Sequence, residues 1–272
     1  YQFNDELFFY VTTRRGFRAA GPNGTGFSAF PELENFAEET VTDVELGLKF
    51  TFDVGGANVT FNIAGYISNF EDIQRTIITP PTIDVDGDGE TADNPFTLVV
   101  NAAQASIDGI EADGAIRFNE YITIGGFINY TDAGFDEFEL IPELVSAISI
   151  DPADTVFTFV PEFTAGAYAN FHYPLGRVGD FSLDMNFFHS GEVSLNSVPG
   201  DPAATEDGYQ LVNLRVGLEK IAGSGFSASF FARNLFDEVY AAAPGFAVAA
   251  FTTATTVFGE PRIVGAELRF DF

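Results

Sequence analysis

The residues best suited to chemistry are three aspartates in one short segment. Asp84, Asp86 and Asp88 alternate with other residues in the sequence Asp-Val-Asp-Gly-Asp-Gly. Carboxylates at alternate positions, with a glycine that permits a sharp turn, supply the oxygen ligands that Ca²⁺ prefers. The twelfth position of such a loop is Pro95 instead of glutamate, and Asp93 is the candidate for a late oxygen ligand. The segment 84–93 is therefore a candidate Ca²⁺ site, although a solvated acidic loop is the favoured interpretation. The sequence predicts no other metal and no cofactor.

The two histidines do not belong to a recognisable catalytic group. His172 shares a strand face with Tyr168 and Asn170, whereas His189 falls on the opposite face at the end of the next strand. A catalytic or metal-binding histidine needs a converging aspartate, serine or second histidine. No nucleophile motif lies near either one. The sequence therefore predicts structural histidines in a protein that is not an enzyme.

A further polar group, Arg233, Asn234 and Asp237, closes a strand near the C-terminus. One interpretation is that these residues contact a ligand from the loop that follows. The favoured interpretation is structural: the arginine pairs with neighbouring carboxylates, and the asparagine and aspartate begin a turn. Phe8, Tyr10 and Tyr66 fall on a polar strand face. The sequence does not decide whether they contact a ligand or another part of the protein.

Ten strand-like segments must position these residues. They alternate apolar and polar residues and are joined by short turns at 55–56, 119–120, 174–179 and 223–224 and by long loops elsewhere, one of them from Asp72 to about Phe96. This alternation of connections is the layout of an antiparallel up-and-down barrel in an outer membrane. The predicted strands are Leu7–Ala19, Val41–Phe52, Asn58–Phe70, Val100–Phe118, Tyr121–Phe135, Phe163–Tyr173, Phe181–Ser190, Tyr209–Lys220, Gly225–Asn234 and Arg262–Phe272.

Charge segregation between the two strand faces is the strictest test of this interpretation. A charge facing lipid costs about 2–4 kcal/mol at mid-membrane, and in the strand centres the charges occupy one face only. Periodicity does not distinguish the inside of a barrel from the outside, so a soluble barrel with an apolar interior stays open. Strand length and loop asymmetry favour the membrane. We therefore expect one set of side chains to face outward and their neighbours to face the concave side: Leu214, Leu183 and Ile63 outward; Arg215, Asp184 and Asn62 inward.

Composition narrows the functional classes. The 272 residues contain no cysteine and no run of eighteen apolar residues, so disulfides, thiolate metal sites and transmembrane helices are excluded. The net charge is −28, with 12 basic against 40 acidic residues, which makes nucleic acid a poor partner. The acidity fits either a saline habitat or a surface that attracts cations. There is no tryptophan, so phenylalanine and tyrosine must serve at any membrane interface.

Five fragments in order along the chain resemble TonB-dependent outer-membrane receptors. They include an aromatic strand ending in Gly-Phe-basic, an Asn-Leu-Phe-Asp-x-x-Tyr signature and a closing Gly-x-Pro-Arg strand with a terminal Phe. Each is weak alone, but together they cover nearly all of the chain. The fragments are FYVTTRRGFRAAG (9–21), TVTDVELGLKF (40–50), NAAQASIDGIEADG (101–114), FARNLFDEVY (231–240) and GEPRIVGAELRFDF (259–272).

The resemblance implies an all-β fold in which residues 1–272 are about ten C-terminal strands of a transmembrane barrel of roughly 22 strands. The plug domain and the segment that contacts TonB would lie outside this sequence. Such a partial barrel is expected to form an open, curved sheet with its first and tenth strands unpaired.

The implied function is active uptake, driven by the TonB complex through the plug, across the outer membrane of a Gram-negative bacterium. Implied partners are the lipid bilayer, lipopolysaccharide and an extracellular small-molecule ligand. An iron–siderophore complex is the default substrate, with sugars and cobalamin as rivals. A passive porin and a soluble or surface Ca²⁺-binding β protein remain the alternatives.

Overall fold

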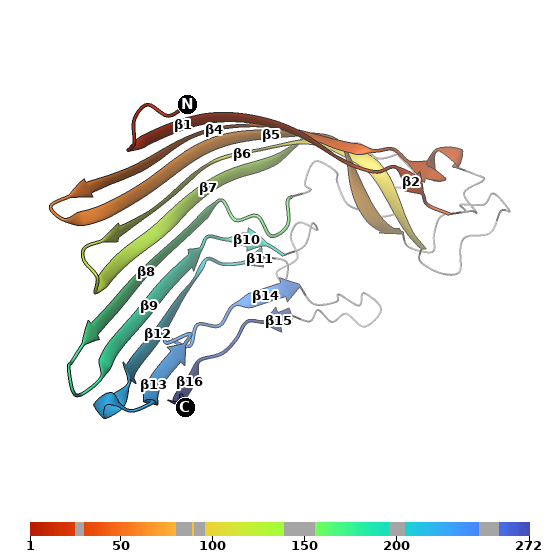
Figure 1. The fold of residues 1–272 in the computed structure, drawn as a ribbon. Helices are drawn as coiled ribbons and strands as arrows, with labels where there is room; N and C mark the ends of the chain where they lie inside the picture. The colour runs from red at the N-terminus through yellow and green to blue at the C-terminus, as the bar shows by residue number, and fades with distance from the viewer. Residues whose placement is uncertain (25–29, 80–88, 90–95, 139–155, 196–204, 245–255) are drawn as a thin grey trace.

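A ten-stranded antiparallel sheet dominates the computed structural model (Figure 1), which describes residues 1–24, 30–79, 89, 96–138, 156–195, 205–244 and 256–272. Neighbouring strands along the sheet are consecutive long strands of the chain, so the topology is up-and-down. In sheet order the strands are β1 (Leu7–Arg18), β4 (Glu39–Val54), β5 (Ala57–Thr79), β6 (Phe96–Arg117), β7 (Ile122–Phe138), β8 (Phe163–Pro174), β9 (Asp180–Ser190), β12 (Tyr209–Glu219), β13 (Phe226–Arg233) and β16 (Ile263–Phe270).

Short turns gather at one end of the sheet and long connections at the other, as the sequence predicts (Figure 1). Gly55 and Gly56 both have positive φ in the β4–β5 turn, a conformation that glycine adopts without steric cost. In the β6–β7 turn the Asn119 side chain accepts hydrogen bonds from the backbone N–H groups of Tyr121 and Ile122. Both chain termini also lie at this turn end.

The long connections carry short elements that the sequence pattern does not reveal. Among the described residues, three small hairpins and one 3-10 helix lie at the loop end, and another 3-10 helix forms the β12–β13 turn. The hairpins pair β2 (Gly21–Pro22) with β3 (Asn35–Phe36), β10 (Val193–Ser194) with β11 (Thr205–Glu206), and β14 (Ala241–Pro244) with β15 (Thr256–Phe258); the 3-10 helices are η1 (Pro31–Leu33) and η3 (Ile221–Gly223).

The prediction of a loop from Asp72 to about Phe96 is wrong over part of this range. Strand β5 continues to Thr79 and pairs with β6 from Phe96 onward. The register shifts between Phe70 and Ile73, and Asp72 has a φ of 57°. Such a bulge inserts unpaired residues and interrupts the alternation of faces, which is why the sequence pattern ends early there.

The buried core is small and lies where this extended hairpin rises beyond the rest of the sheet. Leu98, Ala105 and Ile73 are among its buried apolar residues. Polar side chains fasten the β2–β3 segment to it: Asn23 bonds the backbone of Val99, and Gln74 donates to the carbonyl oxygens of Ala19 and Ala37. The first long connection is therefore held against the hairpin by buried hydrogen bonds.

Strand register separates one apolar and one polar face across the whole sheet. On the apolar face Ile110 and Ile128 remain 55% and 54% exposed, so this face is not buried against any described part of the chain. On the polar face contacts reach over an intervening strand: Tyr66 on β5 meets Thr131 on β7, and Arg215 on β12 meets Glu267 on β16. Side chains two strands apart meet most readily on the inside of a curve, in agreement with a concave polar face.

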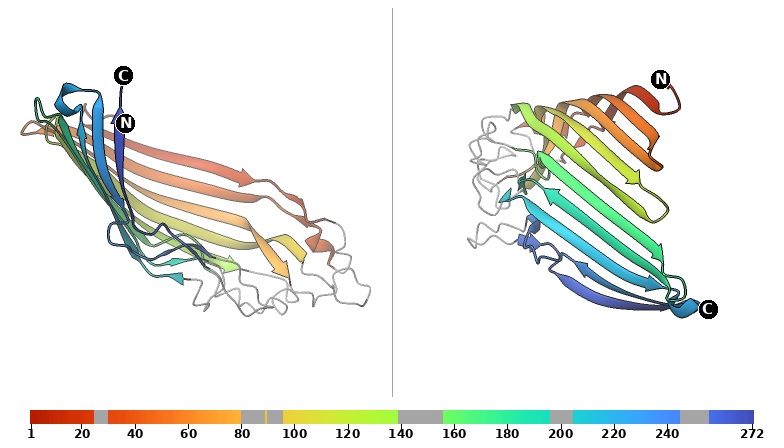
Figure 2. Two further views of the ribbon diagram at one scale, coloured as in Figure 1. Left: turned by 90° about the horizontal axis from the view of Figure 1, so that it is seen from below. Right: turned by 90° about the vertical axis from the view of Figure 1, so that its left-hand side faces the viewer.

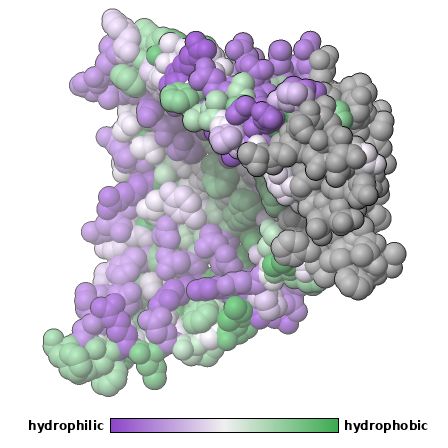
Figure 3. All heavy atoms as spheres, turned by 90° about the vertical axis from the view of Figure 1, so that its right-hand side faces the viewer, coloured by the Kyte–Doolittle hydropathy of each residue, from purple (hydrophilic) through white to green (hydrophobic). Residues whose placement is uncertain are grey.

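The prediction for face orientation is therefore confirmed. Leu214, Leu183 and Ile63 belong to the apolar convex face, and the charged or amide residues at their sides belong to the concave face. Seen from the loop end, the molecule is hollowed, and hydrophilic residues gather around the hollow (Figure 3). The apolar side chains point away from the curve, the reverse of a soluble barrel.

The sheet does not close. β1 and β16 are its two ends and do not pair with one another, as expected for a partial barrel. The two further views show a curved, twisted wall whose strands run diagonally from the turn end to the loop end (Figure 2). Within the described residues, no helix has the length and apolar character to cross a membrane.

Candidate functional site: the concave polar wall

The concave polar face, here called the polar wall, is where the charged and hydrogen-bonding side chains of the described strands gather. In its N-terminal half Arg14 on β1 lies 2.6 Å from Asp43 and 2.5 Å from Glu45, both on β4. The Tyr10 hydroxyl donates to Glu45 at 2.6 Å, and Lys49 lies 5.5 Å from the centre of the Tyr10 ring. The charge of Arg14 is therefore compensated by two carboxylates of the neighbouring strand.

Tyrosine rings on the polar wall lie flat over glycines of the next strand. A Cβ atom added to Gly47 would come within 2.3 Å of the Tyr10 ring, and one added to Gly125 within 2.5 Å of the Tyr168 ring. Glycine leaves room for a ring to lie against the backbone instead of projecting inward. The predicted inward positions of Tyr10 and Tyr66 are confirmed, and Phe8 stacks beside Tyr10 on the same face.

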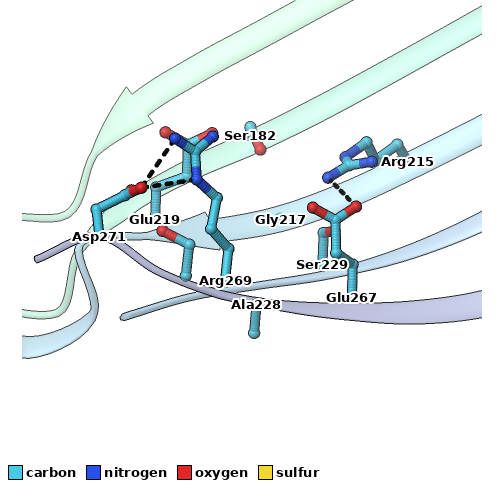
Figure 4. Close-up of a pocket in the computed structure, with 10 residues that line it drawn as sticks. Ser182, Arg215, Gly217, Glu219, Ala228, Ser229, Glu267, Arg269 and Asp271 are labelled. Carbon is cyan, nitrogen blue, oxygen red and sulfur yellow. Dashed lines mark hydrogen bonds and ion pairs between the residues drawn. The ribbon is translucent and has the colours of Figure 1, made fainter. Parts of the chain in front are cut away.

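A hollow of about 230 Å³ lies in the C-terminal half of the polar wall, on β9, β12, β13 and β16 (Figure 4). Its floor is Gly217, which is paired in register with Ser182 on one side and Ser229 on the other. Two ion pairs stand at its rim: Arg215 with Glu267 at 3.1 Å, and Arg269 with Asp271 at 2.9 Å. We call this feature the Gly217 hollow.

The Gly217 hollow was not predicted, although its small residues leave a signal in the sequence. Ser227 and Ser229 alternate with apolar residues on one strand, and Gly217 lies between Arg215 and Glu219 on another. Small residues at every second position of a charged face mark a depression in that face. Whether the depressions of neighbouring strands coincide depends on strand register, which the sequence pattern does not give.

A second hollow of about 440 Å³ adjoins the first and shares Arg215 and Glu267 with it. Amide side chains link the strands that form it. Asn170 donates to Asp184 at 2.7 Å, and Asn213 donates to Asn186 at 2.7 Å. The polar wall here presents hydrogen-bonding groups held in fixed orientations.

The group near the end of β13 forms a structural corner, as the favoured interpretation predicts. Asn234 is 4% exposed, has a φ of 46°, and its side chain bonds the backbone of Glu238 and Glu260. Asp237 accepts a hydrogen bond from the Arg262 backbone and pairs with the Arg262 side chain at 3.6 Å. Arg233 lies 3.6 Å from Glu260. These residues hold the chain leaving β13 against the segment entering β16.

A cation also fastens the turn end of the wall. Lys220, at the start of η3, donates to Asp180 at 2.9 Å. This hydrogen bond, together with the charge of Asp180, raises the pKa of Lys220 above its ordinary value. Lys220 has a φ of 48°, so the bond restrains a residue in a backbone conformation that is rare for lysine.

The histidines occupy the predicted faces. His172 is paired in register with Ser182 on the polar wall, whereas His189 is paired with Ala165 on the convex face. The Nδ1 atom of His189 is buried and has no hydrogen-bond partner among the residues that the structure describes, and its ring lies 5.9 Å from the ring of Phe163. Within the described residues, neither histidine side chain makes a hydrogen bond or an ion pair with a second histidine, a serine or a carboxylate.

The candidate Ca²⁺ ligands Asp84, Asp86 and Asp88, and also Asp93, lie outside the described residues. The structure therefore does not test that prediction. Among the residues that the structure describes, no group of three or more histidine, aspartate or glutamate side chains is arranged to hold a metal ion.

Comparison with known proteins agrees with the fold. The ferric yersiniabactin uptake receptor FyuA from Yersinia pestis superposes with a TM-score of 0.71 at 20% identity, covering 100% of this chain and 36% of that chain. The ferripyoverdine receptor of the outer membrane of Pseudomonas aeruginosa gives 0.64 at 19%, covering 100% and 32%. The copper transporter OprC gives 0.64 at 16%, covering 99% and 38%.

The chain thus spans about a third of the length of these solved structures, and at such identities they show the fold alone. The family relationship comes from a separate comparison. The model of the family described as TonB dependent receptor-like, beta-barrel matches residues 1–235, which is most of the chain. The protein chain therefore belongs to the TonB-dependent receptor β-barrel family.

Proposed function

We propose that residues 1–272 form part of the wall of an outer-membrane receptor that imports an extracellular small molecule with energy supplied through TonB. The observation that carries this proposal is the segregation of the sheet into an apolar convex face and a polar concave face. A wall between lipid and an aqueous lumen requires this arrangement.

The apolar band has the height that a membrane requires. On the convex face it runs from Val59 to Ile67 on β5 and from Ile122 to Tyr130 on β7. About nine residues rise roughly 27 Å along a strand, and a tilt of about 40° reduces this to roughly 21 Å, close to the ~25 Å apolar band of outer-membrane barrels. Beyond the apolar band the same face becomes charged, where Asp108 on β6 lies opposite Asp132 on β7 in the strand register.

Aromatic pairs at the turn end support the placement of that end at the periplasmic interface. The rings of Tyr121 and Tyr173 lie 4.9 Å apart, and those of Phe226 and Phe270 lie 4.6 Å apart. Rings at this level form the girdle that outer-membrane barrels place at the headgroups. Phenylalanine and tyrosine supply it here in a sequence without tryptophan.

The free edges of β1 and β16 support a larger barrel in which this chain is one part. Unpaired backbone groups in lipid cost several kcal/mol each, so both edges must pair with other strands. A barrel of roughly 22 strands, of which this chain supplies ten, would pair both edges, and a plug would lie against the polar wall. The plug, which is not part of residues 1–272, would receive energy from the TonB complex, and the convex face would contact lipid and lipopolysaccharide.

Iron–siderophore complexes are the proposed substrate class. Support comes from two similar structures, which are named as a ferric yersiniabactin uptake receptor and a ferripyoverdine receptor. A third similar structure is named as a copper transporter, so the fold does not restrict the cargo. Sugars and cobalamin remain the rival substrates.

Uptake measured in cells tests the proposal. A strain that lacks its own siderophore receptors and expresses the intact receptor should accumulate radioactive iron from a cognate ferric siderophore. The accumulation should stop when TonB is deleted. Accumulation that continues without TonB would indicate a passive porin and would overturn the proposal, as would recovery of the protein in the soluble fraction.

A further inference from the structure

We propose that the imported molecule has no net negative charge and is an uncharged or cationic complex, such as a ferric hydroxamate. This inference rests on the proposed function, in which the loop end of the sheet faces the outside of the cell. It concerns the five long connections that join strands of the ten-stranded sheet at that end, here together called the acidic mouth. They are residues 19–38, 80–95, 139–162, 191–208 and 234–262.

The acidic mouth is nearly free of basic residues. Its 107 residues contain 20 acidic side chains and a single basic one, Arg262, which gives a net charge of −19 out of −28 for the whole chain. The acidic residues are spread over all five connections, with three, five, five, four and three in chain order. Because every connection contributes, the negative charge belongs to the loop end as a whole and not to one cluster.

A saline habitat does not account for this distribution. Salt adaptation would act on every surface that meets water, including the turn end of the sheet. The turn-end segments contain four acidic and two basic residues among only 25, whereas the acidic mouth contains one basic residue among 107. The depletion of basic residues is therefore specific to the loop end. The turn-end segments are 1–6, 55–56, 118–121, 175–179, 220–225 and 271–272.

The arginines of the strands near the acidic mouth are already engaged or face away from the concave side. Arg75 is half-buried, and its guanidinium group lies 5.4 Å from the centre of the Phe135 ring. Arg15 belongs to the convex face. The remaining arginines each have an acidic neighbour: Arg14 pairs with Asp43 and Glu45, Arg18 lies opposite Glu39 in the register, Arg233 pairs with Glu260, and Arg262 with Asp237.

The charge of a ferric siderophore depends on its chelating groups. Iron(III) has three positive charges. Three hydroxamates, with one negative charge each, give an uncharged complex, and an additional ammonium group makes that complex cationic. Three catecholates, with two negative charges each, give a trianion. The two classes therefore differ strongly in how they respond to a negative surface.

Long-range electrostatics then select between these classes at the point of capture. A charged surface changes the association rate of a charged ligand by about 10- to 10³-fold, in the direction set by the sign of the charges. A trianion is repelled by the acidic mouth, and its binding would require free guanidinium or ammonium groups. An uncharged complex is not repelled, and a cationic complex is attracted.

Reaction of an introduced cysteine with charged reagents measures the potential at the acidic mouth. Thr205→Cys places a thiol on the exposed end of β11, and Ser224→Cys places the matched control in the β12–β13 turn. The intact receptor, in which any other cysteine has been replaced by serine, is treated in detergent with methanethiosulfonates that carry either trimethylammonium or sulfonate. The ratio of the cationic to the anionic rate is divided by that for 2-mercaptoethanol, an uncharged thiol.

The normalised ratio should be roughly sevenfold at position 205 and close to one at position 224. A potential of about one kT gives this value for reagents that differ by two charges. The ratio at 205 should fall towards one in about 1 M salt, where the screening length is only ~3 Å. Equal ratios at the two positions, or a ratio at 205 that persists at this salt concentration, would overturn the inference.

Two neutralising variants show whether the carboxylates cause the effect. Glu192→Gln combined with Asp207→Asn removes two exposed charges from the ends of the β10–β11 hairpin and should lower the ratio at 205 by about twofold. Asp5→Asn removes an exposed charge at the turn end and should leave the ratio unchanged. Equal effects of the two changes would also overturn the inference.

Binding of iron complexes of known charge tests the cargo itself. Ferrioxamine B, which carries an ammonium group, its N-acetyl derivative, which is uncharged, and a ferric tris-catecholate are each incubated with the intact receptor, and the retained iron is measured. Retention should decrease in that order. Tightest retention of the catecholate would overturn the inference.

The two proposals fail in different ways. Iron uptake that continues without TonB would reject the proposed function, whereas the rate ratio at position 205 does not depend on TonB. TonB-dependent uptake together with equal ratios at 205 and 224 would reject the selection by charge and leave the proposed function intact.

Discussion

Asn234 fixes the corner between β13 and β16 through hydrogen bonds of its side chain. Its side chain makes three hydrogen bonds to backbone groups, and its positive φ is tolerated by asparagine better than by most residues. Removing the side chain leaves the partly buried backbone groups of Glu238 and Glu260 without these partners. The Asn234→Ala variant should therefore lose about 2–4 kcal/mol of unfolding free energy.

Urea unfolding of the intact receptor in detergent micelles measures this loss. Asn58→Ala is the control, because Asn58 is exposed and its side chain makes a single hydrogen bond, to Asp53. The control should change stability by less than about 0.5 kcal/mol. Equal losses in the two variants would show that the corner is not fixed by Asn234.

Lys220 provides a prediction about pH. Because its pKa is raised in the folded protein, the contact with Asp180 stabilises the turn below the ordinary lysine value of 10.5 and is lost as the pH rises through the raised value. Residues 1–272 contain two lysines, Lys49 and Lys220, and a Lys220→Arg variant of the intact receptor identifies the Lys220 signal in the NMR spectrum of its ¹³C-methylated lysines. The Lys220 signal should titrate above 10.5, and Asp180→Asn should lower its midpoint. A midpoint that the substitution leaves unchanged would contradict the assigned cause.

At the scale of elements, the contact between β1 and β4 depends on a ring lying over a glycine. Replacing Gly47 with alanine places a Cβ within 2.3 Å of the Tyr10 ring, which must then move away from Glu45. The ring can move toward the open concave side, so the cost is mainly that of the lost hydrogen bond to Glu45, about 0.5–1.5 kcal/mol. The Gly47→Ala variant should lower the temperature at which the receptor unfolds on a semi-native gel.

Gly134→Ala is the matched control for Gly47→Ala. Gly134 also lies within a strand, but a Cβ there would meet nothing within 4 Å. The control should be neutral or slightly stabilising, since alanine restricts the unfolded chain more than glycine does. A control that is destabilised as strongly as Gly47→Ala would assign the effect to the backbone and not to Tyr10.

Alternation predicts the ten long strands and which residues share a face, and strand length together with loop asymmetry predicts which face is convex. Leu214 and Arg215 are neighbours of opposite character, and that contrast survives any choice of strand pairing. The Phe70–Ile73 bulge could not be predicted, because inserted residues remove the period that identifies a strand. The structural role of Asn234 was predicted from its turn chemistry.

The Gly217 hollow marks the limit of such reasoning for the site. It forms because Ser182, Gly217 and Ser229 fall in one cross-strand row, and they are separated by long stretches of sequence. A shift of register by one residue would turn these side chains to the opposite face. Periodicity within a strand fixes which face a residue occupies, but the partners across strands come only from the folded sheet.

At the scale of the whole molecule, the account depends on an aqueous concave side and a lipid-facing convex side. Residues 1–272 contain no cysteine, so single cysteines are introduced into an intact receptor in which any cysteine outside these residues has first been replaced by serine. Ile110→Cys and Ile128→Cys place probes on the convex face, whereas Glu111→Cys and Asn129→Cys place them one residue away on the polar wall. The two probes on one strand, 110 with 111 and 128 with 129, therefore lie on opposite faces at nearly the same depth in the membrane.

Spin labels on these cysteines, in the intact receptor reconstituted in bilayers, test the central claim directly. Collision with oxygen, which concentrates in lipid, and with a water-soluble nickel chelate is measured for each site by electron paramagnetic resonance. Labels at 110 and 128 should relax faster with oxygen, and labels at 111 and 129 faster with the nickel chelate. The reverse pattern, or nickel access at all four sites, would contradict a membrane wall and indicate a soluble sheet.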